Sequence, residues 1–180
     1  MIAPGETMAR PTCVDRPSGY EGGAVLESTA PVIPLVFIDM PAGPGDPYSA
    51  YDASMAPHSI LSFPMAPKNV PDAQGYTWNA ILALYNTSAS TATIAMVFYN
   101  ASGNAYTPTV LEAGQTNPFS LPPRGSQILH MFLISELPDG RFSAVAQSDQ
   151  PLVGMVMLWG GSPVSGTKIP LLPSAGPRMR

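Results

Sequence analysis

The stretch TATIAMVFYN, residues Thr91–Asn100, decides the fold class of this chain. Its apolar residues Ile94, Met96 and Phe98 stand at every second position. A strand sends alternate side chains to opposite sides, so this spacing puts the three residues on one face. Turn-forming residues follow directly, in NASGN. The stretch therefore predicts a β-strand that turns one face toward a core.

Other segments of strand length surround this one, each bounded by turn residues, at spacings typical of an all-β sandwich. They are Ser59–Asn69, Tyr76–Asn86, Ser126–Ile134, Arg141–Asp149 and Pro151–Gly160, with a weaker candidate at Thr107–Leu111. We predict an all-β fold, an Ig-like antiparallel β-sandwich of about seven strands with an extended N-terminal arm.

Proline and glycine set the domain organisation. The 180 residues include 22 Pro and 16 Gly, which is typical of short strands joined by turns rather than of helices. These residues crowd the first third of the chain, where helical periodicity is absent. We expect an extended arm over 1–57, the sandwich over 58–162 and an extended tail over 163–180.

Two of the predicted strands are apolar on both faces. In one, Ile128, His130 and Phe132 oppose Leu129, Met131 and Leu133; in the other, Leu152, Val156 and Leu158 oppose Val153, Met155, Met157 and Trp159. An antiparallel sandwich normally leaves one face of each sheet polar. We therefore expect a partner or the N-terminal arm to cover an outer face.

Charge and cysteine content exclude several protein classes. The net charge is −4 and the chain has only eight Lys and Arg residues, so it lacks the cationic cluster that nucleic acids or an anionic membrane surface require. No apolar run reaches the 18 residues of a membrane span. Cys13 is the single cysteine, which leaves a free thiol or an intermolecular bridge. The first residues lack the pattern of a signal peptide, so either it has been removed or export is unusual.

No constellation of residues predicts catalysis or metal binding, and we expect no enzyme, cofactor or metal site. His58 and His130 have no Ser nucleophile motif beside them; we interpret His130 as a packed structural histidine and His58 as solvent-facing in a loop before the first strand. Asp46 and Asp52 are interpreted as turn residues rather than calcium ligands, because the spacing of known calcium loops is absent. Aromatic residues that offer a sugar-stacking alternative to core packing are Tyr76, Trp78, Tyr99 and Trp159.

Two glycosylation sequons lie in predicted turns. They begin at Asn86 (Asn-Thr-Ser) and Asn100 (Asn-Ala-Ser). Modification at either asparagine requires a host that glycosylates.

The pattern over roughly 59–160 resembles the Ig-like, CARDB-type β-sandwich repeats of bacterial cell-surface proteins. The elements that carry the resemblance are Asn86, Phe98-Tyr99 with Gly103, Pro123-Arg124-Gly125, Leu137-Pro138 with Gly140, and Ser148-Asp149-Gln150-Pro151. The resemblance implies an exported, non-catalytic surface or fibre module, at the cell surface or outside the cell. It implies nothing about residues 1–57.

The apolar octet VIPLVFID, Val32–Asp39, stands alone in the arm and has the length of a strand. A strand supplied by one chain can pair with an unpaired sheet edge of another, and repetition of that contact builds a filament. We predict a donor strand made of Val32, Ile33, Leu35, Val36, Phe37 and Ile38. The tail segment KIPLLP offers a second donor, with Ile169, Leu171 and Leu172.

The leading hypothesis is a structural subunit of an extracellular filament, tube or surface layer, with copies of itself as partners. The alternative hypothesis is a monomeric surface module for adhesion or glycan binding, with the arm folded onto its own domain. A polymer in solution favours the first hypothesis, and a monomer with exposed aromatic residues favours the second.

Overall fold

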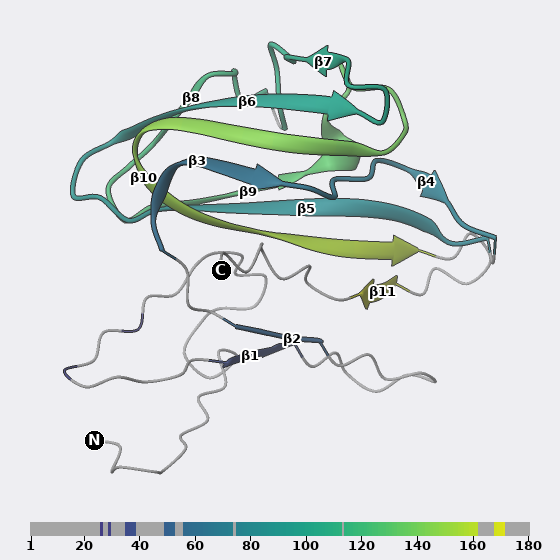
Figure 1. Ribbon diagram of the computed structural model, residues 1–180, viewed down its shortest axis with the longest axis horizontal. Coiled ribbons are helices and arrows are strands. Elements are labelled where there is room, and N and C mark those ends of the chain that lie inside the picture. Colours follow the sequence, from purple (N-terminus) through teal and green to yellow (C-terminus); the bar gives the residue numbers. More distant parts are fainter. Residues whose placement is uncertain are drawn as a thin grey trace.

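A computed structural model describes residues 35–38, 49–52, 56–73, 75–112, 114–161 and 168–171, together with Leu26 and Thr29. The fold is all-β and antiparallel, as the sequence predicted (Figure 1). The strands are β1 (Leu35–Ile38), β2 (Ser49–Asp52), β3 (His58–Phe63), β4 (Val70–Pro71), β5 (Thr77–Asn86), β6 (Ala92–Asn100), β7 (Ala105–Tyr106), β8 (Phe119–Leu121), β9 (Ser126–His130), β10 (Phe142–Gly161) and β11 (Lys168–Leu171). One 3₁₀ turn, η1 (Met131–Leu133), follows β9.

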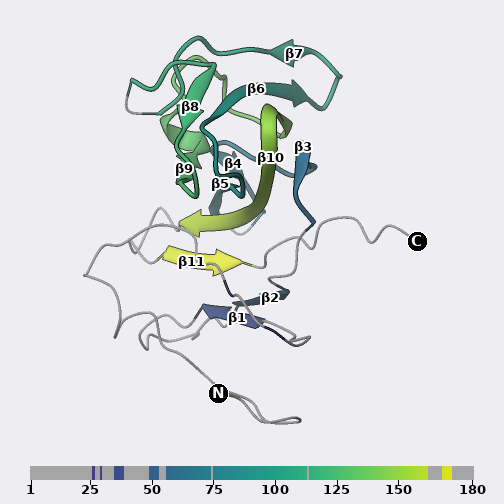
Figure 2. The ribbon, with the colours of Figure 1, turned by 90° about the vertical axis from the view of Figure 1, so that its left-hand side faces the viewer.

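Strand β10 organises the main sheet, which contains nine strands. Its first half, 142–148, pairs with β6 on one side, and β3 pairs with it on the other. Its second half, 152–161, pairs with β5, and β11 pairs with its last four residues. Figure 2 shows β10 curving from beside β6 and β3 down to β11. One strand therefore runs through both layers of the sandwich.

The two layers are named here by the strands that flank each half of β10. Layer A contains β3, the first half of β10 and β6, with β7 and β8 on the far side of β6. Layer B contains β11, the second half of β10 and β5, with β9 and β4 on the far side of β5. Strands β1 and β2 form a separate two-stranded antiparallel sheet.

The core lies between the layers. Ile94, Met96 and Phe98 of β6 are fully buried there, which confirms the face predicted from their alternation. They meet Leu82 and Leu84 of β5 in one hydrophobic cluster. The layers approach closely at Gly154 of β10, where an added Cβ would lie 2.9 Å from the side chains of both Leu61 and Phe63 of β3. Glycine at this position lets β3 pack on layer B.

Four sequence predictions about strand boundaries are wrong. The segment 59–69 is a strand only as far as Phe63, where β3 ends. Residues 107–111 do not form a strand, because Pro108 has no N–H to donate and only an isolated bridge links Val110 to Thr116. The segment 126–134 is not one strand, since β9 ends at His130 and η1 follows. Residues 141–149 and 151–160 are not two strands but parts of the continuous β10.

The η1 turn changes which apolar residues are buried. Met131 and Ile134, three positions apart, are buried, whereas Leu133 is 47% exposed. This spacing matches the three residues per turn of a 3₁₀ helix rather than the alternation of a strand. The predicted face of Ile128, His130 and Phe132 therefore ends at His130.

Lys68 holds the segment after η1 from inside the protein. Its side chain is 5% exposed, and its Nζ donates to the backbone oxygens of Ile134 at 2.6 Å and Leu137 at 2.5 Å. Its backbone also exchanges two hydrogen bonds with Gly140. The buried ammonium thus satisfies carbonyl groups that no strand pairs.

Glu136 holds the same segment from the outside. Its carboxylate accepts hydrogen bonds from the backbone N–H of Thr109 at 2.8 Å, the Thr109 hydroxyl at 2.7 Å and the backbone N–H of Val110 at 2.9 Å. The two bonds from Thr109, aided by the Val110 N–H, lower the pKa of the Glu136 carboxyl. The charged form of Glu136 therefore ties residues 134–137 to the loop after β7.

Replacement of Lys68 should destabilise the fold strongly. A Lys68→Met variant keeps the aliphatic length but leaves the two carbonyl oxygens without a donor, and we expect a loss of about 2–4 kcal/mol in the free energy of unfolding. Urea denaturation measures this loss. The control Arg141→Met alters an exposed side chain and should stay within about 0.5 kcal/mol of the parent. A Lys68→Met variant with the same free energy of unfolding as the parent would refute the structural role of the ammonium.

The contribution of Glu136 should depend on pH in one direction. Because its pKa is lower in the folded than in the unfolded chain, its stabilisation is present above the unfolded value of about 4.3 and is lost as the pH falls through the folded value. The denaturation midpoint of the parent should exceed that of Glu136→Gln at pH 7, and the two should converge near pH 3. A difference that does not change with pH would contradict this assignment.

Candidate interaction surface

Charged residues are rare in the strands of the described sandwich, where Lys168 of β11 and Asp149 of β10 are the two present. Strands β3 to β9 contain no Asp, Glu, Lys or Arg, and β10 contains only Asp149, at the point where it passes between layers. The other charged residues of 56–161 lie in turns and loops: Lys68, Asp72, Glu112, Arg124, Glu136, Asp139 and Arg141. Antiparallel sandwiches in water usually carry polar residues on their outer faces. The strands β3 to β9 are thus neutral on both faces.

The outer face of layer B is mostly apolar. Strand register sets nine residues in three rows across β9, β5 and β10: Ser126, Tyr85 and Val153; Ile128, Ala83 and Met155; His130, Ile81 and Met157. Seven of these nine are apolar or aromatic, and all seven are half-buried. The prediction that β10 is apolar on both sides agrees with this arrangement, since Leu152 and Val156 of the same strand face the core.

The free edge of β6 in layer A is closed. Strands β7 and β8 pair with its two ends. Between them the side chain of Asn117 takes the place of a strand, since its Oδ1 accepts from the Met96 N–H and its Nδ2 donates to the Met96 oxygen, both at 2.9 Å. No further strand can pair here without displacing these groups.

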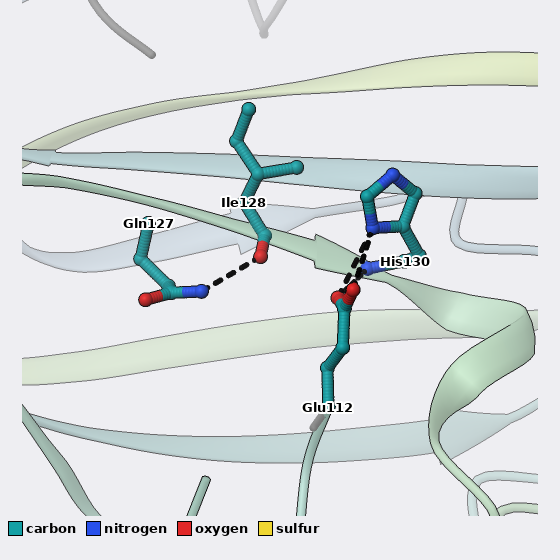
Figure 3. A network of polar contacts seen from close by, with 4 residues as sticks. All are labelled: Glu112, Gln127, Ile128 and His130. Carbon is teal, nitrogen blue, oxygen red and sulfur yellow. Dashed lines mark hydrogen bonds and ion pairs between the residues drawn. The ribbon is translucent and has the colours of Figure 1, made fainter. Parts of the chain in front are cut away.

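The free edge of β9 in layer B is closed by side chains (Figure 3). Glu112 accepts from the backbone N–H of His130 at 2.7 Å and also contacts the ring Nδ1 at 2.9 Å. The Gln127 side chain donates to the oxygen of Ile128 at 2.8 Å. Both backbone groups point away from β5, so the contacts cover positions that another strand would use.

The third edge belongs to β11, which contains Pro170 opposite Trp159 of β10. Proline lacks a backbone donor and is tolerated in sheets mainly on edge strands. This residue limits pairing of another strand with β11.

A further edge, that of β3, has none of these three kinds of protection in the described residues. In the described residues β3 pairs only with β10. It contains no proline and no Asp, Glu, Lys or Arg, and no side-chain hydrogen bond from the described residues closes its backbone. Ile60 on this strand is 58% exposed. Unprotected edges of this kind readily pair with a strand from another chain. We therefore take β3 as the candidate interaction edge.

The histidines occupy different places. His58 is exposed at the start of β3, and His130 is held at the edge of β9 by Glu112 at 2.9 Å. Within the described ranges, no three His, Cys, Asp or Glu residues are grouped closely enough to hold a metal ion. The same part of the chain shows no helix that is long and apolar enough to cross a bilayer.

The aromatic residues considered for sugar stacking are partly engaged. The Trp78 ring covers Gly160, where an added Cβ would lie 2.6 Å from it, and its Nε1 donates to Asp72 at 2.7 Å. Tyr76 lies beside Trp78, with ring centroids 6.3 Å apart. Tyr99 is 37% exposed on the outer face of layer A. Trp78 and Tyr76 thus pack together at one end of the sandwich, beside Gly160.

The structure places part of each predicted donor segment. Leu35, Val36, Phe37 and Ile38 form β1, which pairs with β2; Val32 and Ile33 lie outside the described residues. Ile169 and Leu171 belong to β11, which adds to the chain's own β10; Leu172 lies outside the described residues. The segment β2 was not predicted, because Ser-Ala-Tyr-Asp carries no apolar pattern. Donation to another chain stays a prediction for both segments.

The sequence did not predict that Ile60, Glu112 and Gln127 would lie at sheet edges. Edge status depends on which strands pair, and Glu112 reaches His130 across 18 positions. The available signal was the lack of charge and proline in HSILSF.

Comparisons with known proteins add little. No family model matches the chain, and no curated protein matches it. Two of the solved structures that are similar to this chain illustrate the likeness. The Anabaena sensory rhodopsin transducer shares 15% identity at a TM-score of 0.41, over 54% of this chain and 80% of that one. The structure titled "Crystal Structure of Thermotoga maritima 1070" shares 16% sequence identity with this chain at a TM-score of 0.48. The match covers 68% of this chain and 97% of that one. Both TM-scores are below 0.5, so neither likeness informs the function.

The two sequon asparagines differ in access. Asn86 is fully buried, and its Nδ2 donates to the oxygens of Ser90, Leu121 and Pro122. A glycan on that nitrogen would have to displace these bonds. Asn100 is half-buried in the turn after β6, where its Oδ1 accepts from the backbone N–H groups of Ser102 and Asn104. Only its Oδ1 is used in these bonds.

Expression in a glycosylating host should therefore modify Asn100 and not Asn86. Intact-mass measurement should show at most one N-glycan on the folded chain, and Asn100→Gln should remove it. The matched variant Asn86→Gln should leave the glycan in place while destabilising the fold. A glycan found on Asn86 in folded protein would contradict the burial argument.

Proposed function

We propose that this chain is a structural subunit of an extracellular filament, tube or surface layer, in which copies associate by strand addition. The observation that carries the proposal is the open edge of β3. Two other edges of the sandwich are closed, that of β6 by short strands with Asn117 and that of β9 by the side chains of Glu112 and Gln127, and Pro170 limits pairing at β11. Among these edges of the described sandwich, β3 is the one that offers its backbone to an added strand without such protection.

Strand β1 is the proposed donor. Its four residues are Leu, Val, Phe and Ile, and β2 pairs with one of its two edges. The other edge of β1 can add to β3 of a neighbouring copy, which would extend layer A of the neighbour by the two strands β1 and β2. Donor and acceptor lie in different parts of the chain, so the contact is heterologous and a series of copies need not close.

The neutral sheet faces support assembly in the same way. Self-association of like subunits brings like charges together, and β3 to β9 offer none on either face. Apolar burial rather than ion pairing then drives the contact. The closed edges limit competing pairings that would lead to disordered aggregates.

A charge on the open edge should block assembly. In Ile60→Lys the lysine lies on the strand that would receive the donor, and inward or edge lysines are a common means of preventing strand addition. We expect the parent to form long polymers by light scattering and electron microscopy, and the variant to remain a small species with an unchanged denaturation midpoint.

The matched control is Gln147→Lys. Gln147 is exposed and lies opposite Ile60 in the register, one strand inside the sheet, so it adds the same charge without touching the edge. This control should still polymerise. A synthetic peptide of residues 30–39, which contains the donor, should shorten parent polymers by occupying β3. Equal polymerisation of Ile60→Lys and the parent would refute the proposed edge.

A further inference from the structure

The direction of the backbone groups at the edge of β3 follows from contacts on the other side of layer A. Asn117 binds both the N–H and the oxygen of Met96, each at 2.9 Å, on the side of β6 away from β10. Met96 lies opposite Ala146 of β10, and Ala146 lies opposite Leu61 of β3. Opposite residues of an antiparallel ladder alternate between pairs that exchange hydrogen bonds and pairs that do not. Because Met96 turns its groups away from Ala146, the backbone groups of Ala146 point to Leu61.

The same alternation turns the backbone groups of the neighbouring residues of β3 outward. Ile60 and Ser62 flank Leu61, so their N–H and oxygen groups lie at the free edge, and His58 continues the series. The side chains of these three residues are exposed, whereas Leu61 lies on the core side, against Gly154. Figure 2 shows β3 at the border of layer A. The edge therefore presents three residues to an added strand.

This edge is complementary to a second copy of itself. When two copies of β3 run antiparallel with Ile60 of one opposite Ile60 of the other, His58 of each lies opposite Ser62 of its partner. All of these residues point their backbone groups outward, so each pair can exchange both of its hydrogen bonds. The strand contains no Asp, Glu, Lys or Arg that the pairing would bring together. Ile60, which is 58% exposed, would pack beside its copy across the two-fold axis.

Other registers of this pairing satisfy fewer backbone groups. A shift by one residue sets outward groups opposite groups that already bond to β10. A longer shift in one direction sets Pro64, which has no N–H, opposite His58. The same shift in the other direction sets Ser62 opposite Ala56, which precedes the strand. The register with Ile60 at the axis is the one that matches the three outward residues of both copies.

We propose that free subunits pair through their β3 edges with Ile60 opposite Ile60, which joins two copies of layer A into one sheet. A single strand edge buries less surface than the roughly 1,200 Å² of stable complexes, so the pairing is reversible. Because the same edge is the proposed acceptor, pairing keeps it closed until a donor strand displaces the partner. That regulatory role rests on the proposed function, whereas the pairing itself stands on the geometry of β3.

A disulfide across the axis tests the pairing. Cys13→Ser removes the native thiol, and Ile60→Cys places one thiol on each side of the axis. Opposite residues that exchange hydrogen bonds have Cα atoms about 5.5 Å apart, which suits a disulfide. We expect full-length Ile60→Cys to form a disulfide-linked dimer in a glutathione redox buffer at micromolar protein concentration. Non-reducing electrophoresis and intact-mass measurement give the yield.

The matched control is Ser62→Cys in the same background. Ser62 is also exposed on β3, but its two copies would lie about 13 Å apart along the strands. Its disulfide yield should be at least about tenfold lower than that of Ile60→Cys, because the thiols cannot meet in the paired form. Equal yields would overturn the proposal, since random collision produces them. A higher yield for Ser62→Cys, or a preference for the mixed disulfide when the variants are combined, would overturn it by showing another arrangement.

The pairing and the proposed function fail in different ways. If both hold, the oxidised Ile60→Cys dimer should not polymerise until it is reduced, because its acceptor edges are closed. An oxidised dimer that polymerises would refute the regulatory role. A dimer that forms while neither the reduced variant nor the parent polymerises would refute strand donation and keep the pairing. Polymers of the parent without an Ile60→Cys disulfide would refute the pairing and leave the edge to β1.

Discussion

The structure depends on one constraint, which is that a single strand, β10, belongs to both layers. Strands β3, β5, β6 and β11 all pair with it, so the position of each layer follows from its path. Residues at the end of β5 and the start of β6 hold β10 where it changes layer. Asp149 accepts a hydrogen bond from the Thr93 N–H at 2.8 Å, and the Pro151 oxygen accepts one from the Thr87 hydroxyl at 2.8 Å. Because these bonds reach the turn between β5 and β6, the bend and that turn stabilise each other. Neither layer can shift its register alone.

The spacing of apolar residues along the sequence predicted those features of the fold that depend on neighbouring residues alone. The alternation of Ile94, Met96 and Phe98 identified a buried face, and the apolar residues at alternate positions of 151–159 identified the core-facing Leu152 and Val156. The continuity of β10 was not predictable, because Pro151 and the polar residues before it look like a turn. The short strands β4, β7 and β8 have two or three residues each and leave no periodic signal. They raise the observed count above the seven strands expected.

The candidate edge was beyond local pattern for another reason. An edge is defined by what fails to pair, which depends on contacts such as Asn117 with Met96 across 21 positions. The sequence indicated strand donation from an isolated apolar octet, but not which edge would receive it. Two edges are closed, one by an amide and one by a carboxylate with a second amide, and a proline limits pairing at a third. Because the other edges are protected in different ways, the lack of protection at β3 is a property of that strand and not of the sheet as a whole.

The direction of β3 has a mechanical consequence. The arm enters the sandwich at His58, the first residue of β3, so tension on the arm acts along the axis of that strand. The ladder from Ile60 to Phe63 then resists in shear, with its hydrogen bonds to β10 loaded together instead of one after another. Leu61 and Phe63 add resistance, because their side chains sit against Gly154 at the join of the two layers. Pulling on the arm would thus load the same strand that holds both layers.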